Sequence, residues 1–142
     1  MIWYNLNSIK SYIGTDRFVV SDVTAAFLLD LSNNIIRPYV VLSDSVPSLD
    51  CGLDKVKHVN NLDRYKIKCV DGLCVTDEIS TVIDMINNNS DVATICDSIE
   101  TLLTCNTYSY YIFDLIELIA PYLTTNKLPL EYYLEMVIDY ED

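Results

Sequence analysis

Four residues in this chain carry side chains that could together bind a metal ion: Cys51, His58, Cys69 and Cys74. Structural zinc sites generally use tightly spaced ligand pairs such as C-x₂-C. Here Cys69 and Cys74 form a C-x₄-C pair around Asp71-Gly72, and the other two candidate ligands are irregularly spaced. A tight turn between the cysteines explains their spacing without a metal, so the sequence predicts no metal site and leaves zinc as the weaker alternative.

A cysteine nucleophile with His58 as its base is the second chemistry that these residue types allow. None of the five cysteines stands in a nucleophile-elbow or protease-like local pattern. The glycines Gly14, Gly52 and Gly72 are isolated and cannot build a loop that cradles phosphate. The sequence therefore predicts a protein that is not an enzyme and has no cofactor, with a cysteine-dependent hydrolase as the alternative.

Paired carboxylates occur at helical spacing, where they could serve acid-base chemistry or bind Ca²⁺ or Mg²⁺. Asp114 and Glu117 are three residues apart, and Glu131 and Glu135 are four apart. Both pairs stand beside apolar stripes, where solvated acidic residues are common, and no D-x-D-x-D-G calcium loop occurs. We expect no catalytic role for these carboxylates.

Tyrosines cluster near the C-terminus, at positions 108, 110, 111, 122, 132, 133 and 140. They are too many for one small core, and tyrosine supplies large contact area at interfaces. The alternative is that they only pack in the core and at its rim. The residues predicted to bind a protein are Tyr108, Tyr110, Tyr111, Asp114, Glu117, Tyr122, Tyr132 and Tyr133.

The net charge of −12 is unevenly distributed along the chain. Residues 1–68 carry seven acidic and eight basic residues (+1), whereas residues 69–142 carry fourteen acidic residues and Lys127 alone (−13). Such a surface repels nucleic-acid phosphates and anionic lipid, so we expect neither partner. A protein partner with a basic surface is favoured. Alternatively, the acidic residues only keep the tyrosine-rich surface soluble.

Residues 1–76 show mainly strand signals. Short strands are expected around Gly14 within residues 9–20, followed by a helix capped by Ser21 or Asp22, and then by a strand over residues 39–42. Residues 43–64 are ambiguous, with weak helical spacing that includes Val56 and Val59. Asp71-Gly72 predicts a type I′ hairpin, which pairs Val70 with Leu73 and the half-buried Cys69 with Cys74.

The remaining chain is predicted to be helical. Helices are expected after Asp77, after Ser90 or Asp91, from about Tyr110 to Pro121, and from Pro129 onward. The expected fold class is α+β: a small sheet with β-hairpins, packed by four to six helices, with a helical C-terminal half. No linker or repeat divides residues 1–142, so a single globular domain is expected.

Targeting signals and cysteine usage favour the cytoplasm. The start of the chain lacks the features of a secretory signal, and the most apolar stretch is interrupted by Asp114 and Glu117. An odd number of cysteines favours reduced thiols, although Cys69 and Cys74 could oxidise during purification. The abundance of Asn, Tyr and Ile resembles products of AT-rich genomes such as those of large cytoplasmic DNA viruses, which would place the protein in a host cytoplasm.

Three segments resemble the BTB/POZ family of elongin C and the small adaptor subunit of SCF ubiquitin ligases. They are the N-terminal segment with Ile9-Lys10, residues 16–20 and Ala25-Ala26; the strand region of residues 40–56; and FDLIELIAPYL, residues 113–123. In that family a tyrosine near the cullin-binding surface corresponds to Tyr122 here. Pro121 departs from the family pattern, and residues 59–111 are longer than the family's equivalent. The resemblance implies an adaptor that links a target to a ubiquitin ligase.

Together these patterns predict a non-enzymatic protein-protein interaction module or adaptor, viral in origin if the composition argument holds, that engages host signalling or ubiquitin-ligase components. The alternative within this class is an all-helical viral antagonist of host signalling like the Bcl family, which requires that no hairpin forms over residues 65–76. The sequence leaves homo-oligomer formation open.

Overall fold

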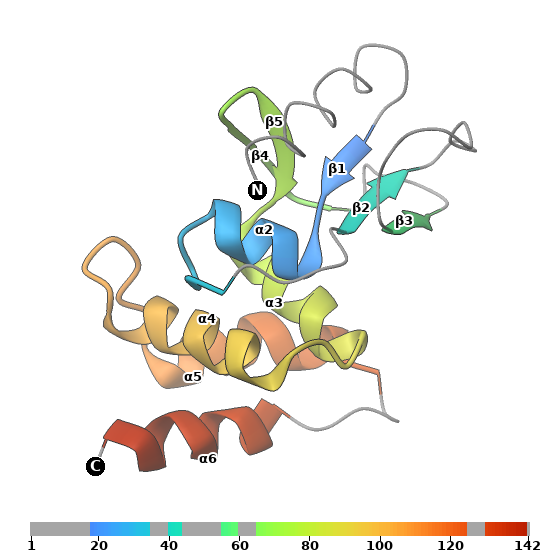
Figure 1. Ribbon diagram of the computed structural model, residues 1–142. Coiled ribbons are helices and arrows are strands. Elements are labelled where there is room, and N and C mark those ends of the chain that lie inside the picture. The colour runs from blue at the N-terminus through green and yellow to red at the C-terminus, as the bar shows by residue number, and fades with distance from the viewer. Residues whose placement is uncertain (1–17, 35–39, 44–54, 60–64, 125–129, 142) are drawn as a thin grey trace.

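The computed structural model describes residues 18–34, 40–43, 55–59, 65–124 and 130–141, which form a small sheet and a set of helices (Figure 1). The strands are β1 (Phe18–Val20), β2 (Val40–Ser43), β3 (Lys55–His58), β4 (Ile67–Val70) and β5 (Leu73–Thr76). The helices are α2 (Asp22–Leu28), α3 (Glu78–Asn87), α4 (Val92–Thr104), α5 (Ile112–Ile119), the 3₁₀ helix η2 (Ala120–Tyr122) and α6 (Leu130–Glu141). The α+β class is therefore confirmed.

The described strands form one mixed sheet in the order β3-β2-β1-β5-β4. The pairs β1/β2 and β4/β5 are antiparallel, whereas β1/β5 and β2/β3 are parallel. The ambiguity over residues 43–64 is decided at Val56, which is on β3 opposite Val41 and not in a helix. Pairing with a neighbouring strand overrides a weak local signal. The expected strand segment at residues 9–17 lies outside the described residues, as does the expected helix start at Pro129.

The hairpin predicted from Asp71-Gly72 is confirmed. Both turn residues have positive φ, 50° for Asp71 and 81° for Gly72, as a type I′ turn requires. Val70 pairs with Leu73 and Cys69 with Cys74. The presence of this hairpin is incompatible with the all-helical alternative. The expectation that the two cysteines are half-buried is wrong, because both are exposed on the hairpin.

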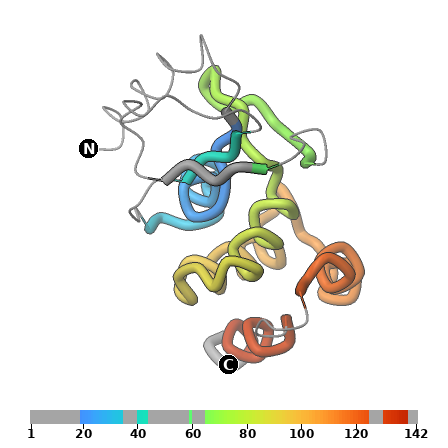
Figure 2. Tube along the Cα trace, turned by 90° about the vertical axis from the view of Figure 1, so that its right-hand side faces the viewer, coloured from blue at the N-terminus to red at the C-terminus, as the bar shows by residue number. Residues whose placement is uncertain are grey.

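The elements are stacked in layers, with the sheet at one end of the molecule and α6 at the other (Figures 1 and 2). Helix α2 packs below the sheet, and α3, α4 and α5 form the next layer. Asp77 and Asp91 begin α3 and α4 as predicted, because each carboxylate accepts the backbone N–H three residues later, of Ser80 and Thr94, at 2.9 Å.

The start of α2 differs from the predicted cap. Ser21 is the N-cap residue, but its hydroxyl donates to Asp84 at 3.0 Å instead of accepting a helix amide. Asp22 has φ of 59° and accepts the N–H of Val23. Its carboxylate also accepts hydrogen bonds from Asn88 and Ser90, so it ties the start of α2 to the α3–α4 turn.

One cluster of buried apolar side chains extends from the sheet through the helices to α6. Val82, Ile95, Ile99 and Leu102 are fully buried within it, as the helical spacing predicts. Ile138 is 44% exposed, because one residue step rotates a helical side chain by about 100° away from the buried Val137.

Candidate functional site

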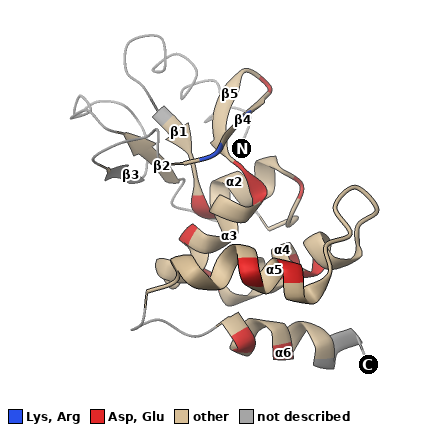
Figure 3. Ribbon diagram, turned by 180° about the vertical axis from the view of Figure 1, so that it is seen from behind, with Lys and Arg blue, Asp and Glu red and all other residues tan. Residues whose placement is uncertain are grey.

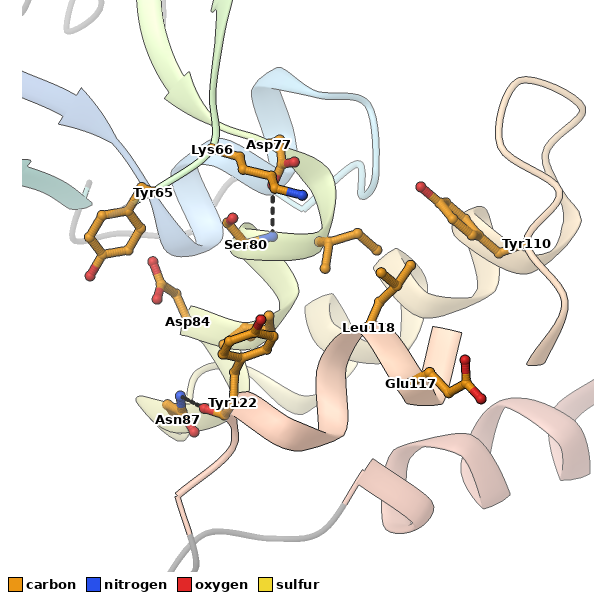
Figure 4. Close-up of a pocket in the computed structure, with 12 residues that line it drawn as sticks. Tyr65, Lys66, Asp77, Ser80, Asp84, Asn87, Tyr110, Glu117, Leu118 and Tyr122 are labelled. Atoms are coloured by element: carbon orange, nitrogen blue, oxygen red, sulfur yellow. Dashed lines mark hydrogen bonds between the residues drawn. The ribbon is translucent and has the colours of Figure 1, made fainter. Parts of the chain in front are cut away.

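A groove of about 500 Å³ opens between α3, the segment that precedes β4, and α5 with η2 (Figure 4). Its lining combines aromatic, apolar and acidic side chains. These are Tyr65, Lys66, Asp77, Ile79, Ser80, Ile83, Asp84, Asn87, Tyr110, Glu117, Leu118 and Tyr122. The groove therefore joins segments that are far apart in the sequence.

Helix α3 supplies one wall of the groove because its two faces differ. Ile79, Ile83 and Asn87 recur every four residues and face the groove. Val82 and Ile86 are on the other face and are fully buried in the core. The amphipathic pattern of α3 thus fixes which side chains reach the groove.

Asn87 connects the end of α3 to the end of the opposite wall. Its amide nitrogen donates to the backbone carbonyl of Tyr122 at 3.1 Å, which Figure 4 shows as a dashed line. Its amide oxygen accepts the backbone N–H of Thr124 at 3.0 Å. These two bonds hold η2, and therefore Tyr122, at the mouth of the groove.

Acidic side chains outnumber basic ones along the groove. Asp77, Asp84 and Glu117 contribute three carboxylates, and Lys66 is the only cation in the lining described here. Asp77 and Asp84 also have internal roles, because Asp77 caps α3 and Asp84 accepts the Ser21 hydroxyl. Figure 3 shows acidic residues spread over the helices, with blue confined to the segment near β4. The groove thus belongs to an acidic surface.

Three of the eight residues predicted to bind a protein come together in this groove: Tyr110, Glu117 and Tyr122. Tyr122 is 68% exposed. Tyr111 and Asp114 are exposed at the start of α5 but are not in the lining, and Tyr132 is exposed on α6. These six residues are therefore divided between the groove and the surrounding surface.

Tyr133 and Tyr108 have structural roles. The Tyr133 side chain is 1% exposed, packed within the core and in edge contact with Tyr132, so it cannot present its ring to a partner. Tyr108 is half-buried near the carboxylate of Glu78, which pairs with Lys68 at 3.1 Å. Burial and the neighbouring Glu78 carboxylate raise the pKa of Tyr108 to about 12. Tyr108 thus links the α4–α5 connection to α3.

Sequence reasoning missed two exposed apolar residues on α5 and the aromatic residue before β4. Phe113 is 76% exposed and Leu118 is 39% exposed. The available signal was that α5 has more apolar residues than one buried face requires. Tyr65 also lines the groove, and no local pattern indicated it.

The sheet order separates the residues considered for cysteine chemistry. His58 is on β3 at one edge, whereas Cys74 is on β5, three strand positions away, and Cys69 is on β4 at the opposite edge. At about 4.8 Å per strand, β3 and β5 are about 14 Å apart across the sheet. Within the described ranges no group of three or more His, Cys, Asp or Glu side chains is arranged to hold a metal. Cys51 lies outside those ranges.

None of the helices in the described part of the chain combines the length and apolarity needed to cross a membrane. Comparison of the chain with protein-family models, curated proteins and solved structures gave no match.

Proposed function

We propose that the protein is a non-enzymatic interaction module that binds a segment of another protein in the groove between α3 and α5. The observation that carries this proposal is the convergence of Tyr110, Glu117 and Tyr122 with Leu118 on one concave surface. Aromatic side chains in a concave site supply contact area at low entropic cost, and tyrosine is enriched among residues that dominate binding energy.

The charge of the groove favours a partner segment that carries Lys or Arg next to an apolar residue. The apolar side chain would contact Leu118 and Tyr122, while the cation would approach Glu117 at the groove's rim. The net charge of −12 attracts a basic partner over longer distances and accelerates association at low ionic strength.

An adaptor role like that implied by the BTB/POZ resemblance is a second candidate within the same class. The strong exposure of Tyr122 favours it, because the corresponding tyrosine of that family lies near the cullin-binding surface. Two features depart from the pattern of the BTB/POZ family. They are the β4–β5 hairpin and strand β3, which lies at the end of the region that resembles the family. A cullin retained by the wild-type protein and lost with Tyr122→Ala would support this role. Engagement of host proteins in the cytoplasm is part of the same proposal.

The decisive experiment is affinity capture from eukaryotic cytosolic extract, followed by titration of each captured partner with purified variants. Leu118→Ala and Tyr122→Ala remove groove side chains, whereas Tyr132→Ala removes an exposed tyrosine on α6 outside the groove. We expect each groove variant to weaken binding by about tenfold or more, as is typical of central interface residues, and the control to change it little.

The salt dependence of the same titration tests the charge argument. Raising ionic strength from about 0.1 M to 1 M shortens the screening length from about 10 Å to 3 Å, so association should slow markedly. Equal binding by wild type, Leu118→Ala and Tyr122→Ala, with all variants folded by circular dichroism, would refute the groove as the binding site.

A further inference from the structure

The β4–β5 hairpin carries two exposed thiols that face each other. Cys69 on β4 is the register partner of Cys74 on β5, and both are free and exposed. Strand β4 is at the edge of the sheet, next to β5 alone among the described strands. Reagents in solution can therefore reach both sulfur atoms.

The position of the pair within the ladder is suited to a covalent bridge. Val70 and Leu73 flank the two-residue turn, and residues in that position exchange backbone hydrogen bonds. The next pair, Cys69 and Cys74, is therefore a non-hydrogen-bonded pair, in which the Cα atoms are about 4.5 Å apart. Disulfides span Cα separations of about 4.4 to 6.8 Å, so the sulfurs can join with little change in the backbone.

We propose that Cys69 and Cys74 form a reversible dithiol site that exchanges with low-molecular-weight disulfides such as oxidised glutathione. The thiolate of one cysteine attacks the glutathione disulfide, forms a mixed disulfide and releases one reduced glutathione. The thiolate of the other cysteine then attacks the protein sulfur of that mixed disulfide and releases the second glutathione. The protein loses two protons and two electrons, and one glutathione disulfide takes them up to become two thiols.

The other cysteines that the structure describes are less suited to this reaction. Cys96 is half-buried on α4, and burial together with the nearby Asp97 and Glu100 carboxylates raises its pKa. A raised pKa lowers the fraction of reactive thiolate. Cys105 is half-buried at the end of the same helix. Neither has the facing register partner that Cys69 and Cys74 provide for each other.

A Cys69–Cys74 disulfide would cross-link the β4–β5 hairpin, whose flanking residues also line the groove. Lys66 and Asp77 flank the open end of the hairpin, where the Asp77 N–H donates to the Lys66 carbonyl at 2.8 Å. Both residues line the groove. The dithiol site nevertheless stands on the hairpin geometry alone and does not depend on the proposed binding function.

The test is equilibration of the reduced full-length protein in buffers of defined reduced and oxidised glutathione, followed by acid quench, alkylation and peptide mass spectrometry. We expect a Cys69–Cys74 disulfide that reduced glutathione reverses. Cys69→Ser and Cys74→Ser should instead accumulate a mixed disulfide on the remaining hairpin cysteine, because the second step is blocked.

A register variant supplies the matched control. Ile67→Cys combined with Cys69→Ser keeps two exposed cysteines on the same face of the hairpin but makes them diagonal neighbours. Diagonal Cα atoms are about 7 to 8 Å apart, beyond the usual disulfide range. We expect this variant to form at least about tenfold less bridged product, because the effective concentration of its second thiol is lower. Mixed disulfides without a bridge in the wild type, or equal bridging in the register variant, would overturn the proposal.

Discussion

At the scale of a single residue, the buried carboxylate of Asp22 joins the start of α2 to the α3–α4 turn. Asp22 is only 3% exposed. Its carboxylate accepts hydrogen bonds from the Asn88 amide at 2.7 Å and from the Ser90 hydroxyl at 2.6 Å. It also accepts the N–H of Val23 at 2.8 Å. Buried polar groups of this kind stabilise a fold only while every partner is present.

Replacing Asp22 with Ala should lower the free energy of unfolding by about 2 kcal/mol, because two hydrogen bonds to a charged acceptor are lost at a partly buried site. Alanine also tolerates the positive φ at this position less well than aspartate does. Chemical denaturation measures the change, with the exposed Asp114→Ala as a control expected to stay within about 0.5 kcal/mol of wild type. Equal stability of the two variants would contradict this role of Asp22.

Tyr108 should make stability pH-dependent in the alkaline range. Its pKa is about 12 in the folded protein, whereas an unfolded tyrosine titrates near 10. Its stabilising contribution is therefore present in full below about pH 10 and is lost as the pH rises through the folded-state pKa. Measurement of unfolding free energy against pH should show a steeper alkaline decline for wild type than for Tyr108→Phe.

The tyrosinate absorbance difference between wild type and Tyr108→Phe isolates this phenol from the other tyrosines. The difference should titrate near the raised value, and Glu78→Gln should lower it because the neighbouring negative charge is removed. A difference that titrates like an ordinary exposed tyrosine would show that Tyr108 is not held by Glu78 in solution.

At the scale of elements, the hairpin and α5 illustrate two different controls on structure. The hairpin is set by its turn residues, because few residues other than Gly adopt positive φ without strain. Helix α5 is set by its apolar spacing, but that spacing leaves Phe113 and Leu118 exposed after the buried face is filled. The conformation of the hairpin is thus determined by its own turn residues. Which side chains of α5 are exposed is determined by the elements that pack against it.

Gly72→Ala should destabilise the hairpin by about 1 to 2 kcal/mol, because alanine at φ of 81° brings its Cβ close to the backbone. Thermal or chemical unfolding measures the change. Asp71→Asn is the matched control, since asparagine tolerates the left-handed region and should change stability little. A loss for Asp71→Asn as large as that for Gly72→Ala would mean that the turn is not held by backbone conformation.

At the scale of the whole molecule, acidic and basic residues are carried by different layers of the fold. The acidic residues are carried mainly by the helical layers, while Lys66 and Lys68 flank or belong to β4 at the edge of the sheet. The groove opens where these regions meet, between α3 and α5. The molecule therefore presents a mixed aromatic and acidic recess, and the basic partner that we propose would approach it there.

Much of the local structure could be predicted from the sequence. Asp77 and Asp91 begin their helices as capping residues, and Asp71-Gly72 determines both the turn and the Cys69 and Cys74 register. The uneven charge is likewise a property of the sequence alone. These features depend on interactions between residues that are close in the chain, so a short window contains their physical cause.

Only the tertiary structure decided which tyrosines are available and which residues form a site. Tyr133 and Tyr122 come from the same sequence cluster, yet one is buried in the core and the other is 68% exposed. The strand order and the presence of Tyr65 and Tyr122 in one groove also depend on contacts between distant segments. Exposure is set by which other elements cover a face, and spacing along one segment does not contain that information.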